Sequence, residues 1–228
     1  GAKTLNKAGL WANYAMDRRE NTLLEDWYRF PSGADRRYGK RMGVNLDGYL
    51  QARPEFVVDG EHMGFRFDGK TQYGELCPRA ADLGAITVDL AVKPEGSGAQ
   101  TIFDFGSDSD NCFVLKTTQN GTPELLAKAG GKTVVSLTGS KPLTKDKWAT
   151  LRIEIDGANT ALWRDGNKVA EKASTFRPRD AFGDGGDNRN FVATSRDASG
   201  RFKGVIDRVV IYHTVHEDFS KLPAPTRD

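Results

Sequence analysis

The feature that most constrains this chain is a series of short segments in which apolar and polar residues alternate one by one. Between Ile86 and Val92 every second residue is aliphatic, and Pro94 ends the run. A period of two places successive side chains on opposite faces of a strand, so it predicts a strand with one buried face. Similar runs occupy residues 65–67, 101–105, 113–117, 133–137, 151–155, 161–164, 168–171, 191–194 and 205–212.

Turn signals separate these runs. The turn signals include Asp-Gly pairs at positions 59–60, 68–69, 156–157, 165–166 and 184–185. The pair suits tight hairpins because glycine accepts a positive φ without steric cost. Strands do not alternate with helical segments, which argues against a parallel α/β sheet. The sequence therefore predicts an all-β antiparallel sandwich.

The first 25 residues follow a different pattern. Leu5, Ala8, Trp11 and Ala15 are spaced by three or four residues, which is typical of an amphipathic helix. We expect residues 4–25 to be helical and residues 1–25 to be a linker or the end of an upstream domain. The expected organisation is therefore an N-terminal helix or linker (1–25), a sandwich (26–222) and a C-terminal tail (223–228).

Charge and composition exclude several classes of partner. The chain has 33 Lys and Arg against 31 Asp and Glu, a formal net charge of +2, which is too balanced to predict nucleic-acid binding. It has no run of about 20 apolar residues, so membrane insertion is not expected. Cys77 and Cys112 are the two cysteines. Whether they pair or stay free is open from the sequence.

Five segments, in this order along the chain, resemble a known family. They are Gly64–Gly69 followed by Tyr73, Ile86–Pro94, Trp148–Gly157, Leu162–Val169 and Phe202–Tyr212. Together they resemble the laminin-G-like branch of the concanavalin A-like lectin/glucanase superfamily. The resemblance implies a two-sheet antiparallel jelly-roll sandwich, here preceded by a short N-terminal helix. It also implies a ligand-binding face with rim loops, and an extracellular or periplasmic module of a larger secreted protein.

Glucanases of this superfamily carry a Glu-x-Asp-x-x-Glu strand motif. The corresponding positions here are Glu154, Asp156 and Asn159, so the third carboxylate is missing. Asp156 is also followed by Gly157, which predicts a turn rather than a strand. Because retaining hydrolysis needs two opposed carboxyl groups, we expect no catalytic residue at this motif.

Asp207 is a candidate metal ligand. In strand phase it shares a face with Val205 and Val209, so we expect it to be shielded and to need a cation, an arginine or N–H donors. The resemblance implies a structural calcium ion held by Asp207 and by oxygens near the first strand, although Phe30-Pro31 departs from the family pattern there. Calcium and a simple hydrogen-bonded aspartate are equal alternatives.

Candidate ligand-binding residues occur in two loops rich in side-chain oxygens and at one tryptophan. Carboxylate and amide oxygens pair with sugar hydroxyls, and an indole offers a platform for a sugar ring. The alternative is that these Asp and Asn residues only shape solvated loops. The candidates are Asp104, Asp108, Asp110, Asn111, Asp184, Asp187, Asn188 and Trp163.

Three functions follow as hypotheses. The first is a non-catalytic module that binds carbohydrate or a protein partner. The second is a glycoside hydrolase or lyase whose acids the sequence does not reveal. The third is a structural spacer that packs through its N-terminal segment against other domains of the parent chain.

Overall fold

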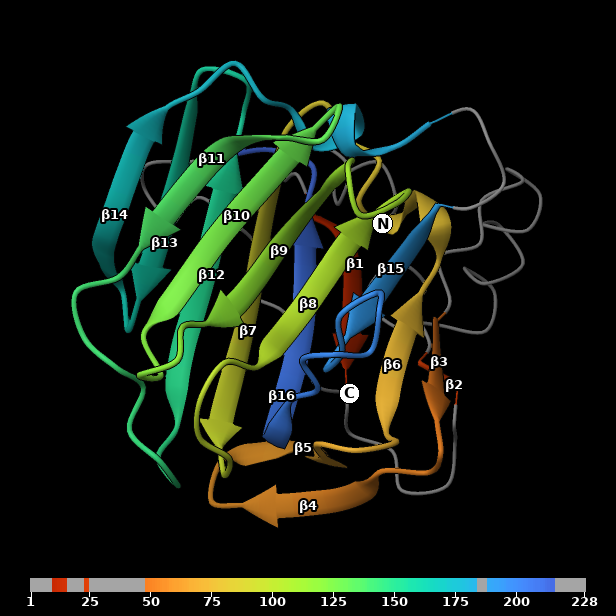
Figure 1. The fold of residues 1–228 in the computed structure, drawn as a ribbon. Coiled ribbons are helices and arrows are strands. Elements are labelled where there is room, and N and C mark those ends of the chain that lie inside the picture. Colours follow the sequence, from red (N-terminus) through yellow and green to blue (C-terminus); the bar gives the residue numbers. More distant parts are fainter. Residues whose placement is uncertain (1–9, 16–22, 25–47, 184–187, 216–228) are drawn as a thin grey trace.

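The computed structural model describes residues 10–15, 23–24, 48–183 and 188–215, and these form two antiparallel sheets packed face to face (Figure 1). Sheet A has the order β14 (Asn167–Ala173), β13 (Asn159–Arg164), β12 (Ala149–Ile155), β7 (Ile86–Pro94), β16 (Lys203–Tyr212), β5 (His62–Asp68) and β4 (Glu55–Asp59), with β1 (Leu10–Ala15) also paired to β16. Sheet B has the order β11 (Lys132–Thr138), β10 (Pro123–Ala129), β9 (Cys112–Thr117), β8 (Thr101–Gly106), β15 (Arg189–Val192), β6 (Tyr73–Leu76), β3 (Gly48–Gln51) and β2 (Leu23–Leu24). Two short 3-10 turns, η1 (Pro78–Ala80) and η2 (Pro178–Ala181), complete the described elements. The predicted all-β, two-sheet antiparallel sandwich is confirmed.

The alternation in the sequence produces the core. Val88, Leu90 and Val92 of β7 face sheet B and are at most 3% exposed. On the inner face of sheet B, Phe105 of β8 packs against Phe113 of the neighbouring strand β9, with ring centroids 5.6 Å apart and the rings nearly perpendicular. Apolar side chains on the inner faces thus interdigitate, and this burial is the main driving force that holds the sheets together.

The Asp-Gly hairpin at residues 165–166 is also confirmed. It joins β13 to β14, with φ of 49° at Asp165 and 78° at Gly166. Two successive positive φ values match the right-handed twist of the flanking strands, and glycine accepts such a value without strain.

The predicted N-terminal helix is not confirmed. Residues 10–15 form strand β1, which runs antiparallel to β16 from Leu10 opposite Tyr212 to Ala15 opposite Arg208. Long-range backbone pairing along β16 prevails here over the helical spacing, because periodicity is only a local preference. The other residues of the 4–25 segment, apart from β2, lie outside the described residues, as do the expected boundaries at 25/26 and 222/223. No helix in the described part of the chain is long and apolar enough to span a membrane.

Candidate functional site

A groove of about 810 Å³ crosses the outer face of sheet B. Its floor includes Asp104 of β8, Val114 of β9 and Leu126 of β10, which lie opposite one another in the strand register. These residues point away from the core because their neighbours in each strand point into it. The loop between β15 and β16 forms one wall, and in Figure 1 it lies in front of β8 and β15.

Arg196 fastens this loop to the floor of the groove. Its backbone N–H donates to Oδ2 of Asp104 at 2.8 Å, and its Nη2 lies 3.4 Å from Oδ1 of the same carboxylate. Its Nη1 donates to the backbone carbonyl of Ser107 at 3.1 Å. Asp104 is only 5% exposed, and burial raises the pKa of its carboxyl group although the bonds from Arg196 oppose this shift. One loop is thus tied to β8 by a nearly buried ion pair.

The other two carboxylates of the groove are held by local donors. Asp197 accepts the hydroxyl groups of Ser195 and Ser199, both at 2.7 Å, and these bonds lower its pKa to about 2. Asp108 accepts the backbone N–H groups of Asp110 and Asn111, both at 2.8 Å, and these bonds lower the pKa of Asp108. Both side chains therefore shape the loops that carry them.

Most cations of the groove are paired as well. Arg189 makes two bonds of 2.8 Å to the carboxylate of Glu75, and Lys116 lies 3.3 Å from Glu124. Lys128 has no ion-pair partner within the described part of the chain and lines the groove beside Cys112. With charges largely neutralised inside the protein, hydroxyl, amide and apolar groups dominate what a ligand would meet.

The two predicted rim loops meet beside the groove. Asp108 and Asn111 come from the β8–β9 loop and Asn188 from the segment before β15, and all three line a hollow of about 380 Å³ together with Phe182. Asp110 takes a different role, since its backbone carbonyl accepts the N–H of Gly131 at 3.0 Å. Asp184 and Asp187 lie outside the described residues.

Trp163 does not join these residues, because it lies on β13 of sheet A. Its Nε1 donates to Oε2 of Glu154 at 3.0 Å, and the Nζ atom of Lys168 lies 5.2 Å from its ring centroid. Glu154 is only 5% exposed, and burial raises the pKa of its carboxyl group. Glu154 therefore lies on the side of β12 away from the core but is still buried.

Asp156 lies in the turn that the sequence predicts. Strand β12 ends at Ile155, and Oδ1 of Asp156 accepts the N–H groups of Ala158 at 2.8 Å and Asn159 at 2.7 Å. Gly157 follows with a φ of 83°. The incomplete glucanase triplet is therefore divided among strand β12, the turn and the first residue of β13.

Asp207 is 4% exposed, which confirms the predicted shielding, but its predicted strand phase is wrong. The register of β16 against β7 shifts between Ile206 and Arg208, so Asp207 is the extra residue of a bulge. As a result Ile206 rather than Val205 faces the core with Val209. One partner of Asp207 is Nδ1 of His62 at 2.7 Å, a contact that the sequence did not indicate.

Gly64 makes the bulge sterically feasible. A Cβ atom at this position would lie 2.2 Å from the carbonyl oxygen of Ile206 and 2.7 Å from Cα of Asp207. Only glycine allows β5 and β16 to approach so closely. This gives a physical reason for glycine at position 64 of the segment Gly64–Gly69.

Two observations on the described residues bear on the predicted calcium site at Asp207. One of its side-chain contacts is an imidazole nitrogen, whereas calcium prefers six to eight oxygen ligands. No group of three or more His, Cys, Asp or Glu suited to a metal occurs among the described residues, and Phe30-Pro31 lies outside them. Calcium at Asp207 stays a prediction. No disulfide joins Cys77 to Cys112, and burial raises the pKa of Cys112 to about 11.

The sequence missed the residues that organise the groove. Arg196 and Asp197 belong to the segment Ser195–Gly200, whose Ser, Asp and Gly content predicts only a loop. Lys128 and Arg189 stand at polar positions of alternating strands and carry no motif. A clue to Asp104 was available, since it lies between Phe103 and Phe105, and a carboxylate between two large apolar residues often needs a partner.

Solved structures share this fold. Domain 4 of an extracellular GH43 arabinanase from Geobacillus stearothermophilus, in complex with arabinotriose, has a TM-score of 0.64 and 16% identity over 89% of this chain and 91% of that one. The CBM40 of a Ruminococcus gnavus IT-sialidase, bound to α2,3-sialyllactose, has a TM-score of 0.53 and 17% identity over 61% of this chain and 81% of that one. A Trypanosoma rangeli sialidase mutant has a TM-score of 0.62 and 13% identity over 96% of this chain, but this chain covers only 32% of it.

No curated protein matches this sequence. The family Laminin_G_3, described as the Concanavalin A-like lectin/glucanases superfamily, matches residues 68–218. This match covers most of the chain and includes four of the segments that carried the resemblance. Together with the sandwich fold, it shows that the chain belongs to the concanavalin A-like lectin/glucanases superfamily.

Proposed function

We propose that this domain is a non-catalytic binding module that recognises carbohydrate through the groove of sheet B. The observation that carries the proposal is the groove itself, whose volume of about 810 Å³ falls in the range of small-molecule sites. Its charged groups are largely paired within the protein. Backbone groups, serine hydroxyls and the apolar side chains of Val114 and Leu126 remain to contact the polar edges and apolar faces of sugar rings.

The comparisons support a saccharide ligand in general terms. The Geobacillus stearothermophilus domain was solved with arabinotriose and the Ruminococcus gnavus CBM40 with sialyllactose. We further propose that this domain acts outside the cytoplasm as part of a larger secreted protein, as does the arabinanase domain. A protein ligand and a purely structural spacer are the alternatives.

A glycoside hydrolase is the second candidate, and one observation favours it. The pKa of Asp104 is raised by burial while the pKa of Asp197 is lowered by serine hydroxyls, and both line one groove. Such a split is typical of acid and base pairs. Against it, both oxygens of Asp104 face Arg196, and Asp197 is bound by its own loop, so neither carboxylate is presented to a substrate.

The test is a glycan array combined with affinity electrophoresis in polysaccharide gels. Val114→Trp fills the floor of the groove, and Val58→Trp is the matched control because Val58 is an exposed valine of β4 in the other sheet. We expect Val114→Trp to abolish retardation and Val58→Trp to preserve it, with circular dichroism confirming that both variants fold.

Three other results would refute the proposal. Equal retardation of both variants would exclude the groove as the site. Release of reducing sugar that Asp104→Asn abolishes would establish the hydrolase instead. Absence of binding to every glycan would leave the protein-ligand and spacer functions.

A further inference from the structure

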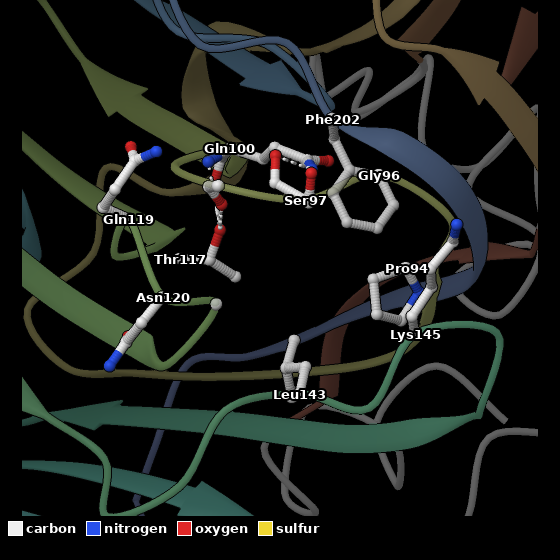
Figure 2. Close-up of a pocket in the computed structure, with 12 residues that line it drawn as sticks. Pro94, Gly96, Ser97, Gln100, Thr117, Gln119, Asn120, Leu143, Lys145 and Phe202 are labelled. Carbon is white, nitrogen blue, oxygen red and sulfur yellow. Dashed lines mark hydrogen bonds between the residues drawn. The ribbon is translucent and has the colours of Figure 1, made fainter.

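A second hollow, of about 180 Å³, lies at one end of the sandwich (Figure 2), and it adjoins the groove at Gln100, which lines both. It is enclosed by the β7–β8 loop, the β9–β10 turn and the β11–β12 loop, with Phe202 at its inner end. In Figure 2, Gln119 and Asn120 stand on one side and Pro94 and Lys145 on the other. We call this hollow the end pocket.

The walls of the end pocket are braced by hydrogen bonds between its loops. The N–H of Leu143 donates to the carbonyl of Gly121 at 2.9 Å, and the N–H of Asp146 donates to that of Pro94 at 2.7 Å. Oε1 of Gln100 accepts the N–H of Lys203 at 2.8 Å. Each loop is therefore tied to a neighbouring segment, and a ligand would bind to a preformed cavity with little ordering cost.

The buried polar side chains of the pocket take part in the hydrogen bonds that hold its loops. Gln100 and Thr117 are 8% and 5% exposed. Oγ1 of Thr117 accepts the N–H of Gln100 at 3.0 Å and donates to the carbonyl of Gly98 at 2.8 Å, while Nε2 of Gln100 donates to the carbonyl of Ser97 at 3.1 Å. These two side chains hold the β7–β8 loop and leave recognition to others.

Three side chains of the lining are free to bind a ligand. Ser97, Gln119 and Lys145 are exposed, and their side chains make no hydrogen bond or ion pair with the rest of the described chain. They supply a hydroxyl, an amide and an ammonium group, all of which can donate. The pocket thus offers three hydrogen-bond donors whose side chains are not engaged within the described chain.

The charge of the end pocket differs from that of the groove. Its lining contains one cation, Lys145, and no carboxylate, whereas three carboxylates line the groove. Glu95 belongs to the β7–β8 loop but does not line the pocket, and its carboxylate lies 3.0 Å from Arg66. The inner wall is apolar and buried, formed by Pro94, Leu143 and Phe202.

We propose that the end pocket binds a single sugar residue that carries a carboxylate. The ring packs on the apolar wall, the carboxylate pairs with Lys145, and hydroxyl groups contact Gln119 and Ser97. A volume of about 180 Å³ accommodates one sugar ring and not an oligosaccharide. This inference rests on the proposed carbohydrate-binding function but names a different site and a charged ligand class.

The test is a titration of the full chain with glucuronate and with glucose, in which binding is monitored through amide chemical shifts in NMR spectra. We expect glucuronate to bind with a Kd of about 1 mM, as suits a site with few contacts, and glucose at least about 10-fold more weakly. Lys145→Gln should remove this preference. Lys147→Gln is the matched control, because Lys147 is an exposed lysine of the same loop that does not line the pocket.

Several outcomes would overturn the proposal. These are equal affinity for the two sugars, a preference that survives Lys145→Gln, a preference lost equally in Lys147→Gln, or no binding of glucuronate. The groove variant Val114→Trp separates this proposal from the previous one. If it abolishes polysaccharide binding and leaves glucuronate binding intact, the two sites are independent, and loss of glucuronate binding in that variant would refute the end pocket.

Discussion

Replacing Arg196 with methionine should release the loop that forms one wall of the groove. The guanidinium carbon of Arg196 lies 5.7 Å from the ring centroid of Phe191. Methionine resembles the aliphatic stem of arginine and can still pack against that ring, but it donates no hydrogen bond. Three contacts of the guanidinium disappear, to Oδ1 of Asp104 at 3.4 Å, to the carbonyl of Ser107 at 3.1 Å and to the carbonyl of Arg189 at 3.4 Å.

The expected cost follows from the burial of Asp104. Removing one partner of a buried ion pair costs about 3–5 kcal/mol. The value here should lie below this range, because the backbone N–H of residue 196 still donates to Asp104 at 2.8 Å and the lost ion-pair contact is long. Three hydrogen bonds at about 1 kcal/mol each give a similar total. We expect the free energy of unfolding at pH 7 to fall by about 2–3 kcal/mol.

The loss should also depend on pH. Burial raises the pKa of Asp104, so its contribution favours folding at low pH and is lost as the pH rises through the raised value. Removing the guanidinium raises the pKa of Asp104 further, since an opposing cation is gone. The deficit of Arg196→Met should therefore be largest at neutral pH and shrink on acidification.

Urea denaturation of the wild type, Arg196→Met, Asp104→Asn and the double variant at pH 7 and pH 5 measures these effects. The double variant should lose less than the sum of the single variants, since the charge left unpaired in Arg196→Met is absent from it. A loss below about 1 kcal/mol, strict additivity, or an equal deficit at both pH values would refute the reasoning.

Three further predictions concern other sites. Gly64→Ala should lower the free energy of unfolding by about 3 kcal/mol, because its Cβ would lie 2.2 Å from the carbonyl oxygen of Ile206. Gly60→Ala is the control, since a Cβ there meets no atom within 4 Å, and thermal melts should show a smaller loss of stability in that variant. Asp197→Asn should lower the free energy of unfolding by about 1 kcal/mol at pH 7 after allowance for solvent screening. The difference in urea midpoints between wild type and variant should vanish as the pH falls toward the lowered pKa of Asp197, about 2. A difference that grows on acidification would contradict this prediction. Calcium at Asp207 predicts a heat of binding in calorimetric titration after chelation that Asp207→Asn abolishes, and no heat in the wild type would end the idea.

Local patterns predicted the strands well because burial on one face imposes a period of two wherever a strand covers a core. The run from Ile86 to Pro94 became β7 with the same bounds, and the pair Asp165-Gly166 became a tight hairpin. The helix predicted for the N-terminal segment is not confirmed. Its helical spacing was overridden by pairing of Leu10–Ala15 with a strand about 200 residues away, which a local window does not contain.

The candidate site was predicted only in part. Asp108, Asn111 and Asn188 line one hollow, but Trp163 lies on the opposite sheet. Both loops are rich in oxygens, so the sequence indicated the residue types. It did not contain the strand order of sheet B, which brings the segment before β15 next to the β8–β9 loop.

The sequence by itself determined that this chain is an antiparallel sandwich, because alternation and turn residues act over a few positions. Only the tertiary structure decided where polar groups meet. The contact of Arg196 with Asp104 joins residues 92 positions apart, and that of His62 with Asp207 joins residues 145 positions apart. A carboxylate that must be shielded can be recognised locally, but its partner depends on register, and a single bulge at Asp207 reverses which face a side chain occupies.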